Sequence, residues 1–152
     1  MTPSVLSARI VTARLAWVRD MIVRIRALPL DTPDTFTADP RTAAAAESFL
    51  RRALEALLDL GRHVLAKGFA VSAAEYKAIA GRLEQVGVLS DADRQVLTRL
   101  AGYRNRLVHF YDEISEQELY EICATQLGDV ERIAGAIADW ARRHPERFDQ
   151  RI

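Results

Sequence analysis

The residues of this chain with the most usable chemistry are an arginine, an asparagine, a histidine and a tyrosine in one short stretch. They are Arg104, Asn105, His109 and Tyr111. Arginine is permanently charged and shaped to bind a phosphate, whereas histidine exchanges a proton near neutral pH. Together they predict a site that cleaves a phosphodiester by acid–base catalysis and charge stabilisation, without a metal. RNA suits such a site because its own 2′-hydroxyl supplies the nucleophile.

The spacing of Arg104 and His109 limits how a single helix can present them. Five positions place the two residues about 140° apart on a straight helix, and Tyr111 would lie within about 20° of Arg104. Either the helix ends or distorts near Val108, or other elements complete the groove, or a two-fold dimer brings two copies of the pair together. Arg106, in the same stretch, is a further candidate for contact with RNA.

A structural interpretation of the same residues needs no catalysis. An arginine and a histidine at this spacing also occur by chance on surface helices. In that case Arg104 forms a surface ion pair, His109 caps a helix end and Tyr111 packs at the rim. The residue types and their spacing, taken alone, favour this interpretation.

Length and composition indicate one helical domain over residues 1–152. The chain is 49% hydrophobic and 28% charged, with few glycines and prolines and many alanines and leucines, which favours an all-α fold. Lys plus Arg total 21 and Asp plus Glu total 21, so the formal net charge is zero. Binding to RNA would therefore need a local basic patch and not overall charge.

Several classes of site and location are not indicated by the sequence. Cys123 is the only cysteine, so neither an intramolecular disulfide nor a cysteine-based zinc site is expected. Paired metal-binding histidines and glycine-rich phosphate loops are absent, and we expect no metal and no cofactor. No apolar run is long enough to cross a membrane, and arginines interrupt the N-terminal stretch, so a cytoplasmic protein is expected.

Periodic apolar residues and capping signals predict about five helices in an up-and-down bundle. The first covers about residues 4–28 and is followed by a loop, or a short helical turn, over 29–39. The bundle that carries the motif covers 40–143, and 144–152 form a short tail. Asp39 before Pro40, and Ser90, mark helix starts, as do two capping boxes that begin at Ser72 and Ser115. The four later helices are expected at 40–67, 72–86, 90 to about 108, and 115 to about 143.

The full string of arginine, asparagine, three residues, histidine, one residue and tyrosine resembles a known signature. It is similar to that of the HEPN superfamily, in particular its HepT-like toxin branch. The segments 50–68, 85–88, 100–103 and 111–114 also look like that branch. The resemblance covers about residues 41–140.

The resemblance implies a helical homodimer that acts as a metal-independent ribonuclease by 2′-hydroxyl transesterification. It would be the toxin of a toxin–antitoxin pair whose antitoxin is a MntA-like nucleotidyltransferase. Carried over, Arg104 binds the scissile phosphate, His109 is the acid–base residue, Asn105 supports the site and Tyr111 accepts adenylyl groups. Two alternatives remain. One is a non-catalytic helical dimer that binds nucleotide or a nucleotidyltransferase partner, and the other is a purely structural protein.

Overall fold

The structure is a computed structural model that describes residues 2–109 and 114–152. Within these residues the chain is all-α, as predicted, and its only β-type pairing is a single bridge. The described residues form seven α-helices, which are α1 (Ala8–Arg26), α2 (Pro33–Thr37), α3 (Pro40–His63), α4 (Tyr76–Gln85), α5 (Asp91–Val108), α6 (Glu116–Thr125) and α7 (Leu127–Arg143). A π-helical turn, Val64–Gly68, extends α3, and a short 3-10 helix, Pro145–Arg147, follows α7.

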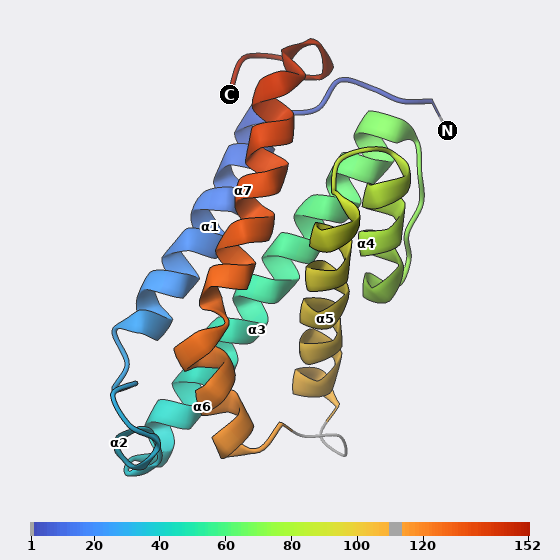
Figure 1. The fold of residues 1–152 in the computed structure, drawn as a ribbon. Helices are drawn as coiled ribbons and strands as arrows, with labels where there is room; N and C mark the ends of the chain where they lie inside the picture. The colour runs from blue at the N-terminus through green and yellow to red at the C-terminus, as the bar shows by residue number, and fades with distance from the viewer. Residues whose placement is uncertain (1, 110–113) are drawn as a thin grey trace.

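The long helix α3 lies at the centre of the bundle and contacts each of the other six helices. α1 and α7 pack together against one side of it, while α4 and α5 form a pair on the other (Figure 1). Residues 69–75 return alongside α3 before α4 begins, so α3 and α4 run in the same direction. The predicted up-and-down alternation is therefore broken once.

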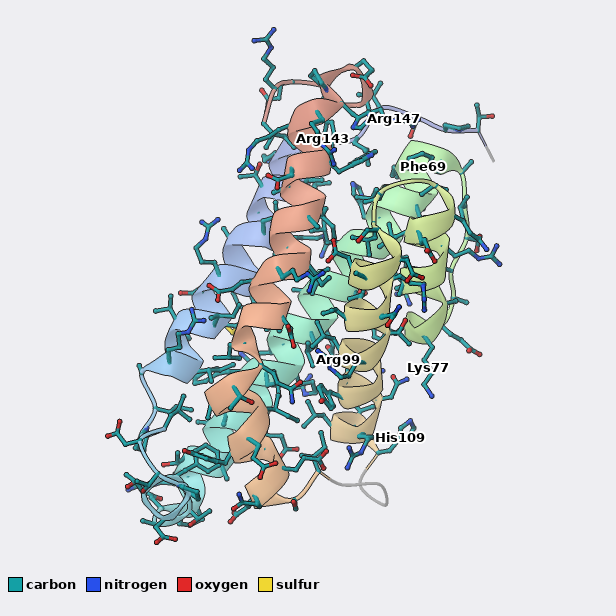
Figure 2. The ribbon with its side chains drawn as sticks, viewed as in Figure 1. Phe69, Lys77, Arg99, His109, Arg143 and Arg147 are labelled. Carbon is teal, nitrogen blue, oxygen red and sulfur yellow. The ribbon has the colours of Figure 1, made fainter. Side chains whose placement is uncertain are left out.

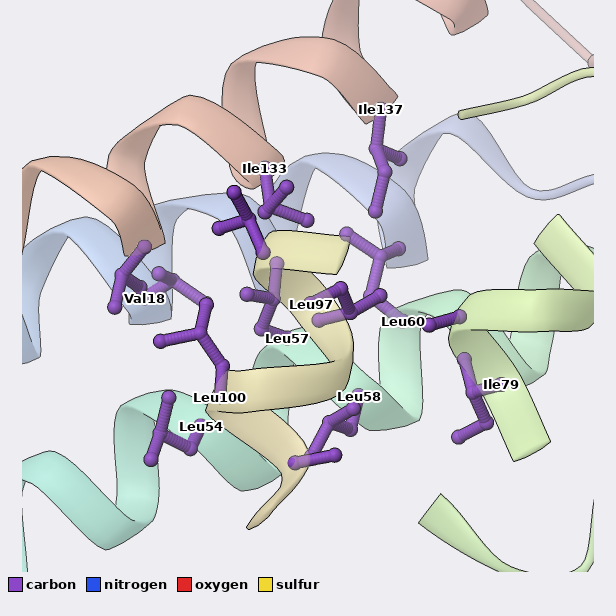
Figure 3. Close-up of a cluster of buried hydrophobic side chains, with 14 of the residues drawn as sticks. Val18, Leu54, Leu57, Leu58, Leu60, Ile79, Leu97, Leu100, Ile133 and Ile137 are labelled. Atoms are coloured by element: carbon purple, nitrogen blue, oxygen red, sulfur yellow. The ribbon is translucent and has the colours of Figure 1, made fainter. Parts of the chain in front are cut away.

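The hydrophobic core is built around the leucines of α3 (Figure 3). Its fully buried members come from four further helices as well, and they include Leu54, Leu57, Leu58 and Leu60 of α3, Val18 of α1, Ile79 of α4, Leu97 and Leu100 of α5, and Ile133 and Ile137 of α7. This apolar stripe fixes where α5 ends relative to α3 and α4. Among the described residues, no helix combines the length and the apolar character needed to cross a membrane.

The prediction of about five helices was too low, because two predicted segments contain more structure than expected. The 29–39 segment, predicted as a loop or a short helical turn and not counted among the five helices, contains α2, which Thr32 caps by accepting a hydrogen bond from the backbone of Thr35. The predicted last helix is divided at Gln126 into α6 and α7. The backbone of Gln126 leaves helical geometry, and its side-chain Oε1 accepts a hydrogen bond of 2.9 Å from the Tyr103 hydroxyl on α5.

Of the four helix starts predicted from capping residues, three are confirmed and one is wrong. The side chains of Asp39, Ser90 and Ser115 each accept a backbone N–H hydrogen bond at the start of α3, α5 and α6. The predicted capping box at Ser72 does not form, since α4 begins only at Tyr76. The cause is a long-range contact, described below, that keeps the preceding segment extended.

Both ends of the chain are tied to the bundle. The first helix begins at Ala8, after an extended segment, and not at the predicted residue 4. Leu6 pairs with Phe148 in a β-bridge, and both side chains are buried. The backbone N–H of Ala8 donates to the Asp149 carboxylate at 2.9 Å. The predicted tail is therefore packed onto the start of α1.

Candidate functional site

The end of α5 separates the histidine of the motif from its arginine and asparagine. Arg104 and Asn105 lie in the last turns of α5, which stops at Val108. His109 follows with extended backbone angles, φ −100° and ψ 99°. The first of the sequence-based alternatives therefore applies, since the 140° separation on a straight helix no longer restricts His109.

Arg104, Asn105 and His109 line one hollow at the open end of the α4–α5 pair. Its volume is about 390 Å³, and its remaining lining comes from Arg62 of α3 and from residues 74–77 around the start of α4. Figure 2 shows His109 where α5 ends and Lys77 toward the same end of α4. The structure thus brings together three of the residues that the sequence singled out, and adds two more cations to them.

Arg104 is held by three neighbours and is largely shielded from solvent. Its guanidinium carbon lies 4.4 Å from the centre of the Tyr76 ring, over its face. Its Nε lies 3.5 Å from Glu55 Oε1, at ion-pair distance but outside hydrogen-bond geometry. Its Nη1 donates to Asn105 Oδ1 at 3.3 Å. Since these contacts fix the position of the cation, Asn105 supports the arginine directly.

Tyr76 connects Arg104 to a second arginine. The guanidinium carbon of Arg62 lies 4.7 Å from the centre of the same ring. The Tyr76 hydroxyl donates to Asp59 Oδ1 at 2.8 Å, and Arg62 Nη1 contacts that same oxygen at 3.3 Å. Burial and the hydrogen bond to Asp59 raise the pKa of Tyr76 above its ordinary value. The phenol therefore stays neutral and packs as a platform between cations.

Arg62 also explains why α4 begins late. Its Nε donates to the carbonyl of Ala73 at 3.0 Å and its Nη2 to the carbonyl of Ala74 at 2.9 Å. These bonds hold the segment before α4 extended against α3, and they place Tyr76 beneath Arg104. With its donors used in this way, Arg62 acts as a structural clamp.

Of the other two sequence-predicted residues, Arg106 does not line this hollow. Arg106 points to a different groove, between α3 and the start of α6, and pairs with Glu118 through two hydrogen bonds of 2.7 Å. That pair lowers the pKa of Glu118. The contact of Arg106 with RNA stays a prediction. Tyr111, the expected modification site, lies outside the described residues.

Sequence reasoning did not identify the residues that position Arg104. Tyr76 reads as one apolar member of a helix stripe, and Glu55 and Asp59 read as solvated charges on α3. The spacing of Glu55 and Asp59, one helical turn apart, was the only local signal that they share a face. Within the described residues, no cluster of three or more His, Cys, Asp or Glu side chains is arranged to hold a metal ion.

Several solved structures share this fold. The tri-AMPylated HEPN toxin of Shewanella oneidensis, in complex with an MNT antitoxin, aligns with a TM-score of 0.78 at 22% identity over 86% of this chain and 97% of that one. A toxin–antitoxin complex with AMP-PNP aligns with a TM-score of 0.75 at 20% identity, over 84% and 97% of the two chains. The cytosolic protein YutE of Bacillus subtilis, of unknown function, gives 0.76 at 17% identity, over 93% and 94%.

The sequence comparisons give the family. No curated protein sequence matches this chain significantly. The sequence profile described as Ribonuclease HepT-like matches residues 18–137. This range includes the motif and the helices α3, α4 and α5, which position Arg104. This confirms the resemblance stated above. Because the match spans well over half of the sequence, the chain belongs to the Ribonuclease HepT-like family.

Proposed function

We propose that this chain is a metal-independent RNA endonuclease that acts as the toxin of a toxin–antitoxin pair. The observation that carries the proposal is the shared hollow of Arg104, Asn105 and His109. A permanent cation and an imidazole, which can accept and donate a proton, lie in one open space, as phosphodiester cleavage by acid–base catalysis requires. The membership of the Ribonuclease HepT-like family supports the same reaction.

Each residue has a role in the proposed reaction. His109 accepts the proton of the RNA 2′-hydroxyl, and the oxygen attacks the adjacent phosphorus. The 5′-oxygen leaves with a proton, so the products are a 2′,3′-cyclic phosphate and a 5′-hydroxyl. Arg104 stabilises the charge that builds on the phosphate oxygens, because Tyr76 and Glu55 hold it in place before the substrate arrives.

We propose that the active form is a homodimer. A two-fold axis through the end of α5 would place two copies of Arg104 and His109 in one groove. Val108, which is 39% exposed beside His109, provides apolar surface for such a contact. A second His109 would then be available to protonate the leaving oxygen.

We further propose that a MntA-like nucleotidyltransferase is the antitoxin and that it modifies Tyr111. In this step AMP passes from ATP to the phenolic oxygen of Tyr111, and pyrophosphate is released. The Shewanella oneidensis relative, described as tri-AMPylated and bound to an MNT antitoxin, supports this assignment. Phosphates added two residues after His109 in the sequence would repel the phosphates of RNA.

Induced expression in bacteria tests the proposal as a whole. Wild type should arrest growth and degrade RNA, and His109→Ala should do neither at equal protein level. Coexpression of the nucleotidyltransferase should protect cells that carry wild type but not those that carry Tyr111→Phe. Harmless expression of wild type with intact RNA would instead favour the non-catalytic binding dimer.

A further inference from the structure

A second hollow lies between α1 and α3, on the far side of the acidic residues that position Arg104. Its volume is about 490 Å³. α1 contributes Arg14 and Trp17 to its lining, and α3 contributes Arg52, Glu55 and Asp59. The hollow is separate from the one that contains His109, with which it shares no lining residue.

Trp17 is the unusual member of this hollow. Its side chain is 45% exposed, although it is among the largest apolar groups in the chain. The other tryptophan, Trp140, is 2% exposed and packs against Phe69 and Phe148. The core therefore does not account for the indole of Trp17, whose surface remains available to a flat ligand.

The charges around Trp17 suit a ligand with phosphates. Arg14 and Arg52 are exposed at the two sides of the hollow. The pKa of His63, further along the same face of α3, is lowered by burial and by the positive charges of Arg14 and Lys67. Arg14 and Lys67 thus both lie near His63, at this end of the α1–α3 groove. An exposed aromatic ring flanked by arginines is a common arrangement for binding single-stranded nucleic acid.

Glu55 and Asp59 join this hollow to the proposed site. Both line the hollow, yet Glu55 lies 3.5 Å from Arg104 Nε and Asp59 accepts the Tyr76 hydroxyl at 2.8 Å. Glu55 is also paired with Arg51 and Asp59 with Arg62, so cations offset the charges of both carboxylates. Glu55 and Asp59 therefore connect the lining of the Trp17 hollow to Arg104 and its Tyr76 ring.

We propose that the α1–α3 hollow is a subsite for single-stranded RNA, in which one unpaired base stacks on Trp17. Arg14 and Arg52 contact the phosphates on either side of that base. This inference rests on the proposed ribonuclease function and deepens it, because it predicts a substrate whose unpaired segment extends beyond the cleaved bond. Paired RNA would leave no base free to stack.

A second copy of this chain is the competing occupant of the hollow, and the charges favour RNA. The centres of protein–protein interfaces are depleted of charged residues. Here the indole is surrounded by two arginines and two carboxylates. Burying these side chains in a protein interface would desolvate the two exposed arginines without a compensating contact.

Binding to the cleavage-inactive His109→Ala protein tests the subsite without relying on catalysis. The probe is a ten-nucleotide unpaired RNA, with the same sequence in a duplex for comparison. We expect tryptophan fluorescence to be quenched by the single strand, since Trp140 is buried and only Trp17 is accessible. Adding Trp17→Ala should weaken the Kd about tenfold, as for the loss of one base–aromatic stack. Arg14→Ala should weaken it and reduce its salt dependence.

Matched controls come from the same helix. Val23→Ala removes another exposed apolar side chain, and Arg9→Ala removes another exposed cation, both outside the hollow. Neither should change the Kd by more than about twofold. Unchanged affinity in Trp17→Ala, or an equal loss in the controls, would overturn the proposed subsite. So would a change in the oligomeric state of Trp17→Ala without RNA, because it would assign the hollow to a protein interface.

Failure of the subsite and failure of the ribonuclease function give different results. If the subsite is correct and the chain is not a nuclease, single-stranded RNA still quenches Trp17 while wild type leaves it uncut. If the chain is a nuclease without this subsite, wild type cuts RNA and Trp17→Ala has an unchanged KM. If both are correct, Trp17→Ala raises KM about tenfold and leaves kcat within about twofold.

Discussion

Replacing Tyr76 tests whether the ring beneath Arg104 prepares the site for catalysis. In Tyr76→Leu the faces that contact Arg62 and Arg104 are lost, together with the hydroxyl bound to Asp59. Each cation–π contact is worth about 0.5–1 kcal/mol at a partly exposed site, and the hydrogen bond to a carboxylate adds about 1 kcal/mol or more. The free energy of unfolding should therefore fall by about 2–3 kcal/mol.

The companion variant Tyr76→Phe separates the ring from the hydroxyl. It retains both cation contacts and loses only the bond to Asp59, so we expect it to cost about 1 kcal/mol. The rate of cleavage should depend on the aromatic ring and not on the hydroxyl. Tyr76→Phe should keep kcat within a few-fold of wild type, whereas Tyr76→Leu should lose about 10- to 100-fold because Arg104 is no longer oriented.

Urea unfolding gives the stability changes, and cleavage of a short RNA at saturating concentration gives kcat. The control is Tyr120→Leu on α6, which removes a hydroxyl bound to the carbonyl of Leu30 and an edge contact with Phe36 and does not line the hollow. It should lose comparable stability without loss of kcat. A folded Tyr76→Leu protein that cleaves RNA as fast as wild type would refute this account of Arg104.

Three further predictions concern stability and reactivity. Gly61→Ala would place its Cβ 2.8 Å from Ile79 Cγ2 and should destabilise the α3–α4 contact by about 1–3 kcal/mol. In Gly81→Ala the new Cβ meets nothing within 4 Å, so this variant should stabilise α4 by about 0.5–1 kcal/mol. Urea unfolding measures both changes. Because Arg106 lowers the pKa of Glu118, the pair stabilises the fold above the ordinary value of 4.5, and this is lost as pH falls through the folded pKa. Glu118→Gln should therefore be less stable than wild type at pH 7, by under about 1 kcal/mol since solvent screens the pair, and the difference should disappear as pH falls through the folded pKa of Glu118. Burial raises the pKa of Cys123 to about 12, so iodoacetamide at pH 8 should label it only as fast as the protein unfolds; rapid labelling of the native protein would contradict its burial.

The sequence predicted those parts of the fold that local chemistry decides. Asp39, Ser90 and Ser115 cap helices where expected, because an N-cap requires only a side chain and the backbone two or three residues ahead. Ser72 offered the same signal and failed. There, Arg62 binds two backbone carbonyls that the local pattern assigned to a helix, so a contact between distant residues prevailed.

The sequence did not predict the break at Gln126, because this break also involves a contact between distant residues. Apolar residues continue in phase through the break, and no proline or capping serine marks it. Its partner is the hydroxyl of Tyr103, on a different helix. Periodicity within one segment does not contain that information.

The candidate site likewise contains residues that the local sequence predicted and residues that only the tertiary structure brings together. Arg104, Asn105 and His109 are close in sequence, and their chemistry was recognisable from residue type and spacing. Tyr76, Glu55 and Asp59 were not, because their role arises only when α3, α4 and α5 pack together. Most of the geometry that gives Arg104 its position is therefore tertiary.

The most direct test of the central claim is cleavage of RNA by the purified protein in excess chelator, with analysis of the product ends. Wild type should leave 2′,3′-cyclic phosphate and 5′-hydroxyl ends, and it should not cut an oligonucleotide with a 2′-deoxyribose at the scissile position. His109→Ala should be slower by about 100-fold or more. Cleavage that requires an added divalent cation, or an equally active His109→Ala protein, would contradict the account.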